Sequence, residues 1–356
     1  MLTLRVIQIK MANAERYAGL LDDDDLLLLK HKDAGNTYNK TFDLSTLSGK
    51  ECKALFRFEK EHIPLLRTEL GLPNRLKGEN GCVFSGDEGL CVVLRRLAYP
   101  NRLSDLSHLF DRSSVELWLV FNKTLNSIHE EKCYLLKTLN QGWLSHANLD
   151  TFAQSVSAAG APLTNCWGFI DGTVRPICRP SLHQRLVYNG HKRVHGLKFQ
   201  MVSAPNGMIA NLFGPIEGKR HDSGMLRESR LLEDLEQSMT KPDGSVYCLY
   251  GDPAYPLRPQ LIAPFRGAVL PKDQARFNKR MSSVRVTVEW AFGKILSNFA
   301  FVDYKKNQKL YLQPVGQYYD VAALFTNCHT CLYGSESGIS LDFNPRPYMS
   351  IYMDNQ

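Results

Sequence analysis

The sequence predicts an α/β protein in which a helical region precedes a mixed sheet with flanking helices. Apolar residues recur at helical spacing before residue 150, and short apolar or alternating runs typical of strands begin at Cys166. Three acidic residues of this second part, Asp171, Asp252 and Glu289, stand at two predicted strand ends and on a predicted helix. A carboxylate at a buried strand end is costly unless a cation or a donor satisfies it, so these acids indicate a shared chemical role.

Composition is that of an ordinary soluble globular protein. The chain has 356 residues, of which 44% are hydrophobic and 22% charged, enough for two domains or for one large domain with additions. Its nine cysteines are odd in number and lack a disulfide-framework spacing, which favours a reducing compartment. Cys328-His-Thr-Cys331 has the form of half a zinc site, but no second pair follows it, so a helix with buried thiols is the stronger interpretation.

The N-terminal segment does not fit a signal peptide, because Arg5 and Lys10 interrupt its apolar stretch. No uninterrupted apolar run approaches the roughly 20 residues that a membrane span needs. We therefore expect a protein that stays inside the cell and does not use a membrane. Met1 and Met11 are both candidate natural starts.

Residues 1–84 are predicted to be a mostly helical region with loops. The acidic run at 22–25 precedes four leucines and indicates a helix start, since acids favour the first helical turn. Residues 36–50 are polar without periodicity and predict a loop, whereas residues 53–70 return to helical spacing.

Residues 85–150 predict a helix-turn-helix-like region. A capping pattern at Ser85–Glu88 begins one helix, a short helix follows at 103–110, and a turn at 111–113 precedes a longer helix from Ser114. Three helices with a tight turn before the third are the layout of a helix-turn-helix. Packing in a simple helical bundle is the alternative, and both stay open.

The third helix is poor in groups suited to base reading. Its expected exposed residues are Arg112, Ser113, Ser114, Asn122 and Lys123. We take Arg112 and Lys123 as candidates for DNA contact.

Residues 151–335 predict the mixed sheet, and residues 336–356 a C-terminal tail. Strands are predicted at 166–170, 193–203, 208–213 and 246–250. Pro205-Asn-Gly207 is a hairpin signal, a helix begins near His221, and a later helix carries Glu289. The order of three strands, a helix, a strand and further helices matches a ribonuclease-H-like α/β layout.

Basic charge is concentrated in one segment. The whole chain has a net charge of +7, whereas residues 256–310 hold eleven Lys or Arg residues against three acids, a net charge of +8. Such clustering indicates a polyanionic partner, with a solvated basic face as the alternative. The candidates for DNA contact here are Arg276, Lys279, Arg280 and Arg285.

The three acids suit a two-metal site for phosphoryl transfer. Two divalent ions roughly 4 Å apart can hold the attacking and leaving oxygens of an in-line displacement, and Mg²⁺ prefers carboxylate oxygens. We expect Asp171 to bridge the ions, Asp252 to lie beside it if their strands pair, and Glu289 to reach in from its helix. Gly172 and Gly251 flank two of the acids and are expected to let backbone approach a phosphate.

Asp222 is a fourth candidate metal ligand, and an N-cap role for it stays equally open. His221 beside it could assist proton transfer. Lys219 and Arg220 could hold phosphate at the helix N-terminus.

Four motifs resemble the DDE nuclease domain of PIF/Harbinger transposases and their domesticated relatives. They are Ile170-Asp-Gly-Thr173, His221-Asp-Ser223, Gly251-Asp-Pro-Ala-Tyr-Pro256 and Val288-Glu-Trp-Ala-Phe-Gly293. The segments 314–316 and 322–328 are also similar, and Leu94–Arg102 resembles the helix-turn-helix that precedes that domain. The resemblance covers roughly residues 85–335. Ala254 departs from the family, where Gly often precedes the Tyr, but the acid is intact.

The resemblance implies a ribonuclease-H-like fold, Mg²⁺-dependent cleavage and transfer of DNA strands, and action in the nucleus, with some protein in the cytoplasm. Asp171, Asp252 and Glu289 occupy the family's catalytic positions and Asp222 its additional metal position. Mn²⁺ is expected to substitute for Mg²⁺. The family commonly acts with a separate Myb-like DNA-binding protein, and a homo-oligomer is compatible with these features.

Two other functions compete with a nuclease. One is a domesticated, non-cleaving DNA-binding or scaffold protein on the same fold, and the other is an unrelated metal-dependent phosphatase. Intact acids favour the nuclease, because a scaffold has no need to keep three buried charges. A phosphatase needs neither the helix-turn-helix nor the basic segment.

Overall fold

The computed structural model describes residues 42–78, 81–241, 243–334 and 349–353, and these fall into two compact units. The first unit comprises Met1–Cys133, Pro176–Leu182 and Leu296–Ala322, and the second comprises Tyr134–Arg175, His183–Ile295 and Ala323–Gln356. The predicted helix start at 22–25 and the choice between Met1 and Met11 lie outside the described residues.

The first unit is mainly helical. Its elements begin with α3 (Gly49–Phe56), α4 (His62–Glu69), the hairpin of β1 (Arg75–Lys77) and β2 (Val83–Ser85), α5 (Gly86–Ala98), α6 (Leu103–Phe110) and α7 (Ser114–Lys132). The helix predicted at 53–70 is two helices, because Arg57 takes a left-handed conformation (φ 69°) that ends α3.

The three helices of the predicted helix-turn-helix-like region are confirmed as elements. Ser85 caps α5 by accepting from the backbone N–H of Glu88, and Ser113 caps α7 in the same way with Glu116. Asp111 is left-handed (φ 49°) and turns the chain between α6 and α7. DNA reading by this region stays a prediction.

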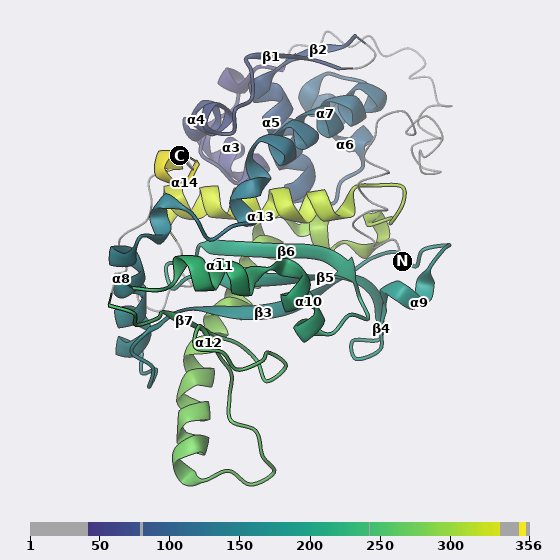
Figure 1. Cartoon of the computed structure of the whole chain (residues 1–356). Coiled ribbons are helices and arrows are strands. Elements are labelled where there is room, and N and C mark those ends of the chain that lie inside the picture. The colour runs from purple at the N-terminus through teal and green to yellow at the C-terminus, as the bar shows by residue number, and fades with distance from the viewer. Residues whose placement is uncertain (1–41, 79–80, 242, 335–348, 354–356) are drawn as a thin grey trace. The chain divides into compact units, whose positions relative to one another are not determined.

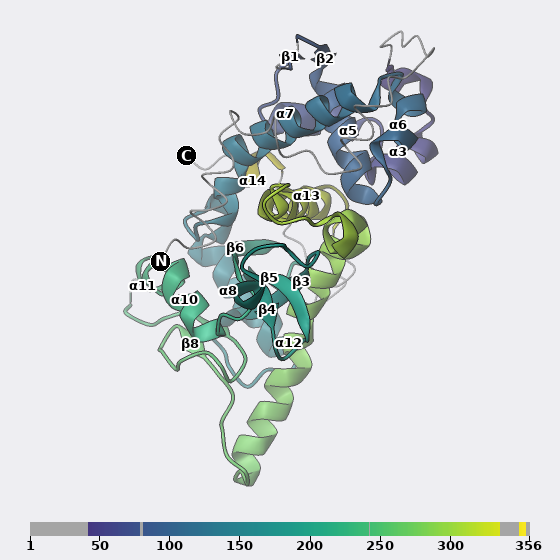
Figure 2. The same ribbon diagram turned by 90° about the vertical axis from the view of Figure 1, so that its right-hand side faces the viewer.

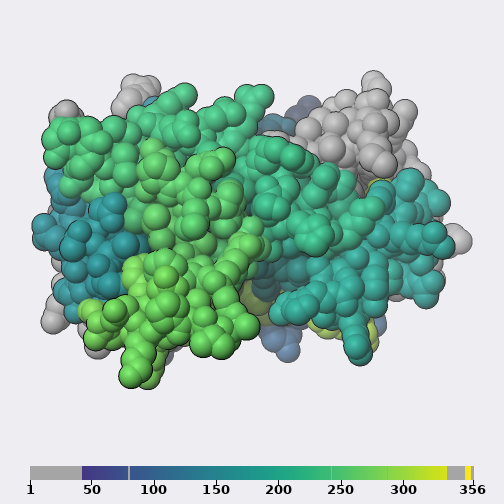
Figure 3. Space-filling view, turned by 60° about the horizontal axis from the view of Figure 1, so that its bottom comes forward, coloured from purple at the N-terminus to yellow at the C-terminus, as the bar shows by residue number. Residues whose placement is uncertain are grey.

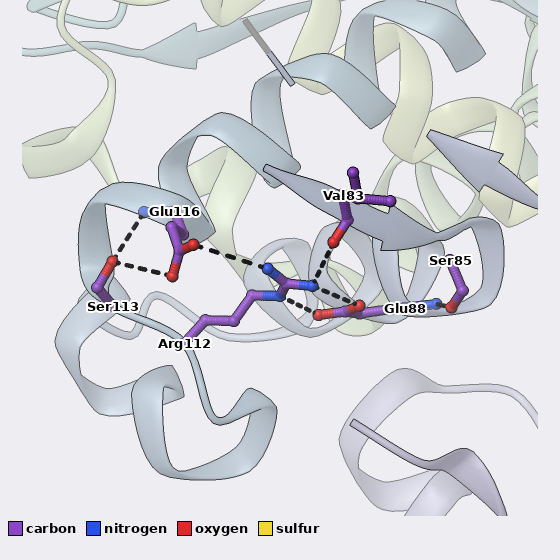
Figure 4. A network of polar contacts seen from close by, with 6 residues as sticks. All are labelled: Val83, Ser85, Glu88, Arg112, Ser113 and Glu116. Carbon is purple, nitrogen blue, oxygen red and sulfur yellow. Dashed lines mark hydrogen bonds and ion pairs between the residues drawn. The ribbon is translucent and has the colours of Figure 1, made fainter. Parts of the chain in front are cut away.

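The turn before α7 faces inward (Figure 4), and two residues that were expected to be exposed are buried. Arg112 is only 1% exposed, and its guanidinium donates twice to the carboxylate of Glu88 and, over 2.9 Å, to the carbonyl oxygen of Val83. Ser114, expected on the surface, is 7% exposed. Because the buried carboxylate of Glu88 needs a cation, Arg112 serves this pair and is not available to DNA.

The second unit is built on a six-stranded sheet, β4-β5-β3-β7-β8 with β6 paired to β5 (Figure 1). The strands are β3 (Cys166–Pro176), β4 (Tyr188–Asn189), β5 (Val194–Ser203), β6 (Ile209–Glu217), β7 (Cys248–Tyr250) and β8 (Leu261–Ile262). All four predicted strands and the hairpin between β5 and β6 are confirmed, whereas the two-residue strands β4 and β8 were too short to show a pattern. The mixed sheet with flanking helices has the predicted ribonuclease-H-like α/β character.

The remaining helices are α8 (His146–Ala158), α9 (Gln184–Val187), α10 (Asp222–Ser229), α11 (Leu231–Ser238), α12 (Lys272–Asn298), α13 (Val315–Tyr333) and α14 (Met349–Met353). Figure 2 shows α10 and α11 on one side of the sheet, α12 on the other, and the N-terminal half of α12 projecting beyond the strands. The single helix expected near His221 is α10 and α11, because Arg230 between them is left-handed (φ 56°). Cys328 and Cys331 lie in α13, as the helical interpretation predicted.

No helix in the described ranges combines the length and the apolar character that a bilayer crossing requires.

Arg112→Met should destabilise the first unit by about 3–5 kcal/mol, because it leaves Glu88 as a buried charge without its cation. Arg112→Met with Glu88→Leu should recover most of that loss, since no buried charge then remains. Urea denaturation measures both, with Lys123→Met on the exposed side of α7 as the control. A loss no larger for Arg112→Met than for Lys123→Met would contradict the assignment.

Candidate metal-binding and catalytic site

Parallel pairing of β3 with β7 places two of the predicted acids at one edge of the sheet. The register pairs Phe169 with Tyr250, so Asp171 and Asp252 each follow two residues later on neighbouring strands. The pairing of these two strands, on which the expected position of Asp252 beside Asp171 depended, is therefore present. Asp171 was predicted to end its strand, but it lies within β3, which continues to Pro176.

Asp171 is held by backbone on one oxygen and by a cation on the other. Its Oδ1 accepts from the backbone N–H of Gly172 over 2.8 Å, and its Oδ2 lies 3.0 Å from Nη1 of Arg285. Burial raises the pKa of Asp171, Arg285 opposes that rise, and the negative charge of Asp252 adds to it. The two acids therefore interact electrostatically, as a shared site requires.

Asp252 closes a turn at the end of β7. Its Oδ1 accepts from the backbone N–H of Ala254 over 2.9 Å, which fixes one oxygen of the carboxylate. Burial raises the pKa of Asp252, and the like charge of Asp222 raises it further, whereas Arg285 and Lys198 lower it. Asp252 is thus a partly desolvated acid between a second acid and two cations.

Asp222 is not an N-cap. His221 holds the capping position without a side-chain bond, and Asp222 is the first residue of α10. Its Oδ1 accepts from Nζ of Lys198 over 2.6 Å, and the same amine donates to the carbonyl oxygen of Arg220 over 2.9 Å. Lys198 is 7% exposed on β5, so it is a fixed cation that holds Asp222 against the site.

Glu289 joins this group through Arg285. The two residues are one turn apart on α12, and Nη2 of Arg285 lies 3.4 Å from Oε1 of Glu289. Since Nη1 of the same guanidinium binds Asp171, Arg285 bridges the sheet acid and the helix acid (114 residues separate it from Asp171). The prediction that Arg285 is a DNA contact is untested, but in this structure its charge serves the carboxylates.

Gly172 and Gly251 were expected to leave room for a phosphate near the backbone. In the structure, neighbouring side chains fill that room instead. A side chain at Gly172 would place its Cβ 2.7 Å from Oδ1 of Asp222, and one at Gly251 would place it 2.7 Å from the ring of Tyr255. Both positions need glycine because those neighbours fill the space.

Tyr255 brings an unsatisfied donor to the same place. Its side chain is 1% exposed, and its hydroxyl has no hydrogen-bond partner in the structure. Burial raises the pKa of Tyr255, and the charges of Asp222, Asp171 and Asp252 raise it further, so all three acids lie near the ring. The carboxylate oxygens and this buried hydroxyl fit a hydrated divalent cation, because a metal-bound water can donate a hydrogen bond to the hydroxyl oxygen of Tyr255.

The acids do not stand ready to chelate an ion in this arrangement. Within the described parts of the chain, no group of three or more His, Cys, Asp or Glu side chains is close enough to hold one metal ion. Arg285 lies between Asp171 and Glu289, and Lys198 occupies Asp222. Convergence of Asp171, Asp252 and Glu289 around a metal therefore stays a prediction.

The other predicted DNA contacts divide into engaged and exposed side chains. Arg220 pairs with Glu217 and Glu228, and Arg280 donates to the carbonyl oxygen of Gly160. Lys219, Lys279 and Lys123 are exposed, and so is Arg276, which pairs with the still more exposed Asp273. Figure 3 shows the light green residues of α12 and of the segment before it gathered in one projecting lobe.

Sequence reasoning missed the roles of Lys198, Tyr255 and Arg285 at the acids. Lys198 gave a weak signal, because a lysine in an apolar strand must find an anion when it is buried. Tyr255 belongs to the motif of Asp252, and its position there gives no sign that its hydroxyl is buried. No pattern in the sequence could have shown which carboxylate Arg285 meets.

Comparison with known proteins identifies the domain that carries these residues. Residues 170–327 match a family described as DDE superfamily endonuclease, and this segment is such a domain. Protein ALP1-like of Arabidopsis thaliana is 22% identical over 242 residues, which cover 65% of this chain and 57% of that protein. The chain thus spans little more than half the length of the curated relative that it matches. No solved structure matches.

Asp252→Asn should raise the melting temperature of the metal-free protein at neutral pH. The folded-state pKa of Asp252 lies above its ordinary value of 3.8, so its charge costs stability above that pKa, and the cost disappears as pH falls toward 3.8. Asn keeps the acceptor for Ala254. We expect a rise of about 2–4 °C at pH 7, the scale of about 1 kcal/mol, and none near pH 4.

Differential scanning fluorimetry across this pH range measures the effect. Glu236→Gln, at an exposed acid of α11, is the matched control. A pH-independent difference between Asp252→Asn and the wild type would show that repulsion and burial of the charge are not its cause.

Proposed function

We propose that the DDE superfamily endonuclease domain of residues 170–327 cuts and joins DNA strands by metal-assisted phosphoryl transfer. The observation that carries this proposal is the parallel register of β3 and β7, which brings Asp171 and Asp252 to one sheet edge. Glu289 reaches the same place from α12, as its link through Arg285 indicates. These three acids are the metal ligands and catalytic residues of the proposal, with Asp222 as a supporting acid.

The protein's own contribution is to fix negative charge where a cation is needed. Gly172 and Ala254 donate backbone hydrogen bonds that hold one oxygen of Asp171 and of Asp252. Burial and mutual repulsion make these charges costly, so a cation that neutralises them is favoured. A bound Mg²⁺ or Mn²⁺ would activate the attacking oxygen and stabilise the leaving oxygen.

We propose DNA as the substrate because the N-terminal half of α12, which lies in the basic segment 256–310, projects from the helix that carries Glu289. The N-terminal half of α12 extends beyond the sheet and carries the exposed Arg276 and Lys279 (Figure 1). Such side chains position a duplex through its phosphates without reading its sequence. The specificity is proposed to come in part from a separate Myb-like DNA-binding protein, with action in the nucleus and a homo-oligomer as further parts of the proposal.

A non-cleaving DNA-binding or scaffold protein is the second candidate. The ion pairs of Arg285 with Asp171 and Glu289 favour it, because they already give two of the acids a cationic partner without a metal. The two candidates share DNA binding and differ only in strand cleavage.

Nicking of a supercoiled plasmid with Mg²⁺ or Mn²⁺ separates the two candidates. The wild type should convert the plasmid to open circles, and Asp252→Asn should lose this activity by at least about 100-fold while keeping DNA affinity within about threefold, since it removes a ligand but no phosphate contact. Glu236→Gln should behave as the wild type. Plasmid that stays supercoiled with the wild type, at DNA concentrations where binding is saturated, favours the scaffold.

DNA affinity should depend steeply on salt, and the exposed basic residues of α12 should carry part of that dependence. Replacing both Arg276 and Lys279 by Gln should lower the slope of log affinity against log salt by about 1.8 on duplex DNA, roughly 0.9 for each lost phosphate contact. Fluorescence anisotropy with a labelled duplex between low and moderate salt gives the slope. Lys50→Gln, at an exposed lysine of α3, is the control, and an unchanged slope in the double variant would assign these residues to a solvated face.

A further inference from the structure

The guanidinium of Arg285 stands where the acids of the site meet. It lies 3.0 Å from Oδ2 of Asp171 and 3.4 Å from Oε1 of Glu289. Its charge also lowers the pKa of Asp252 and opposes the burial that raises the pKa of Tyr250 to about 12. One side chain therefore provides positive charge to all three of the acids proposed as metal ligands.

The two cations at the site differ in how firmly they are held. Lys198 is almost fully buried on a strand and is fixed by Asp222 and by the carbonyl oxygen of Arg220. Arg285 keeps 23% of its side chain exposed and reaches in from α12, where Ser282 and Ser283 beside it are exposed. Arg285 is therefore the more loosely held cation, whereas Lys198 is tied to the start of α10.

We propose that Arg285 is an exchangeable internal cation that competes with the metal for Asp171 and Glu289. In the metal-free protein its guanidinium forms ion pairs with both carboxylates. When a divalent cation binds them, Arg285 releases both oxygens and turns toward the surface, where it pairs with a phosphate of the DNA. The inference rests on the proposed function, because it assumes that these acids are metal ligands.

Charge and geometry support this exchange. A carboxylate oxygen that accepts from a guanidinium cannot at the same time hold a metal ion at about 2.1 Å without repulsion between the two cations. Arg285 is on the helix whose projecting half carries the exposed basic residues, so an outward turn adds it to the face proposed to bind DNA.

The competing assignment is a positioning role, in which Arg285 holds Glu289 in place for the metal. The two roles predict opposite changes in metal affinity when Arg285 is removed. If Arg285 competes, its removal tightens metal binding, and if it positions Glu289, its removal weakens metal binding.

Titration calorimetry of the full chain with Mn²⁺, without DNA, measures whether the variant binds the metal more tightly or more weakly. Arg285→Gln should lower the Kd for Mn²⁺ by about tenfold, or about 1.4 kcal/mol. Arg285→Lys keeps the charge and should stay closer to the wild type. Arg75→Gln is the control, because it removes an exposed arginine of β1 in the first unit, and it should leave the Kd unchanged.

The second half of the proposal is measured on DNA. Between chelator and saturating Mn²⁺, the salt slope for a short duplex should steepen by about 0.9 in the wild type and not in Arg285→Gln. Thermal melts confirm that each variant is folded, and a denaturing gel confirms that the duplex is intact.

Each outcome decides the proposal. Tighter Mn²⁺ binding by Arg285→Gln supports it, including the case in which the wild type binds no Mn²⁺ and the variant does. Unchanged or weaker binding by the variant, with clear binding by the wild type, overturns the exchange and leaves the proposed nuclease function standing. If neither protein binds Mn²⁺, the exchange and the metal-dependent function both fail.

Discussion

Negative charges that share the edge of a buried sheet repel one another, and they cannot remain there unless cations stand between them. This constraint organises the second unit. Asp171 and Asp252 come to one edge because β3 and β7 are parallel neighbours, and Asp222 is packed against Gly172. The fold then places Lys198 from β5 and Arg285 from α12 against these acids, so a strand of the sheet and a helix that flanks it contact the same site.

The first unit meets the same constraint with a different result. Arg112 and Glu88 are both almost fully buried, and the guanidinium also satisfies the carbonyl oxygen of Val83 (Figure 4). Glu116 also approaches this guanidinium, at 3.9 Å. Arg112 thus joins β2, α5 and α7 as a buried structural cation, whereas Arg285 in the second unit keeps 23% of its side chain exposed.

The acids of the second unit lie close together, and this requires close packing of the residues around them. Glycine at 172 and 251 lets a carboxylate and an aromatic ring approach the strands, and the hydroxyl of Tyr255 is left without a partner among three acids. Burial makes each charge more costly and each neutralising contact stronger, because the surrounding dielectric is low. A cation at this edge would relieve repulsion and desolvation together, which is the physical basis for linking metal binding to the DDE superfamily endonuclease domain.

The sequence by itself determined the elements and the acids. Period-two and apolar runs predicted β3, β5, β6 and β7, the Asn-Gly turn predicted the hairpin, and the motifs around Asp171, Asp252 and Glu289 predicted a nuclease-like site. These signals are local, since each lies within a few neighbouring residues. The tertiary structure alone decided which cation meets which acid: Arg112 turned inward to Glu88, Lys198 held Asp222, and Arg285 bridged Asp171 and Glu289. Ion pairs between distant segments depend on how strands and helices pack, and a charged residue looks the same in sequence whether it faces solvent, DNA or a buried carboxylate.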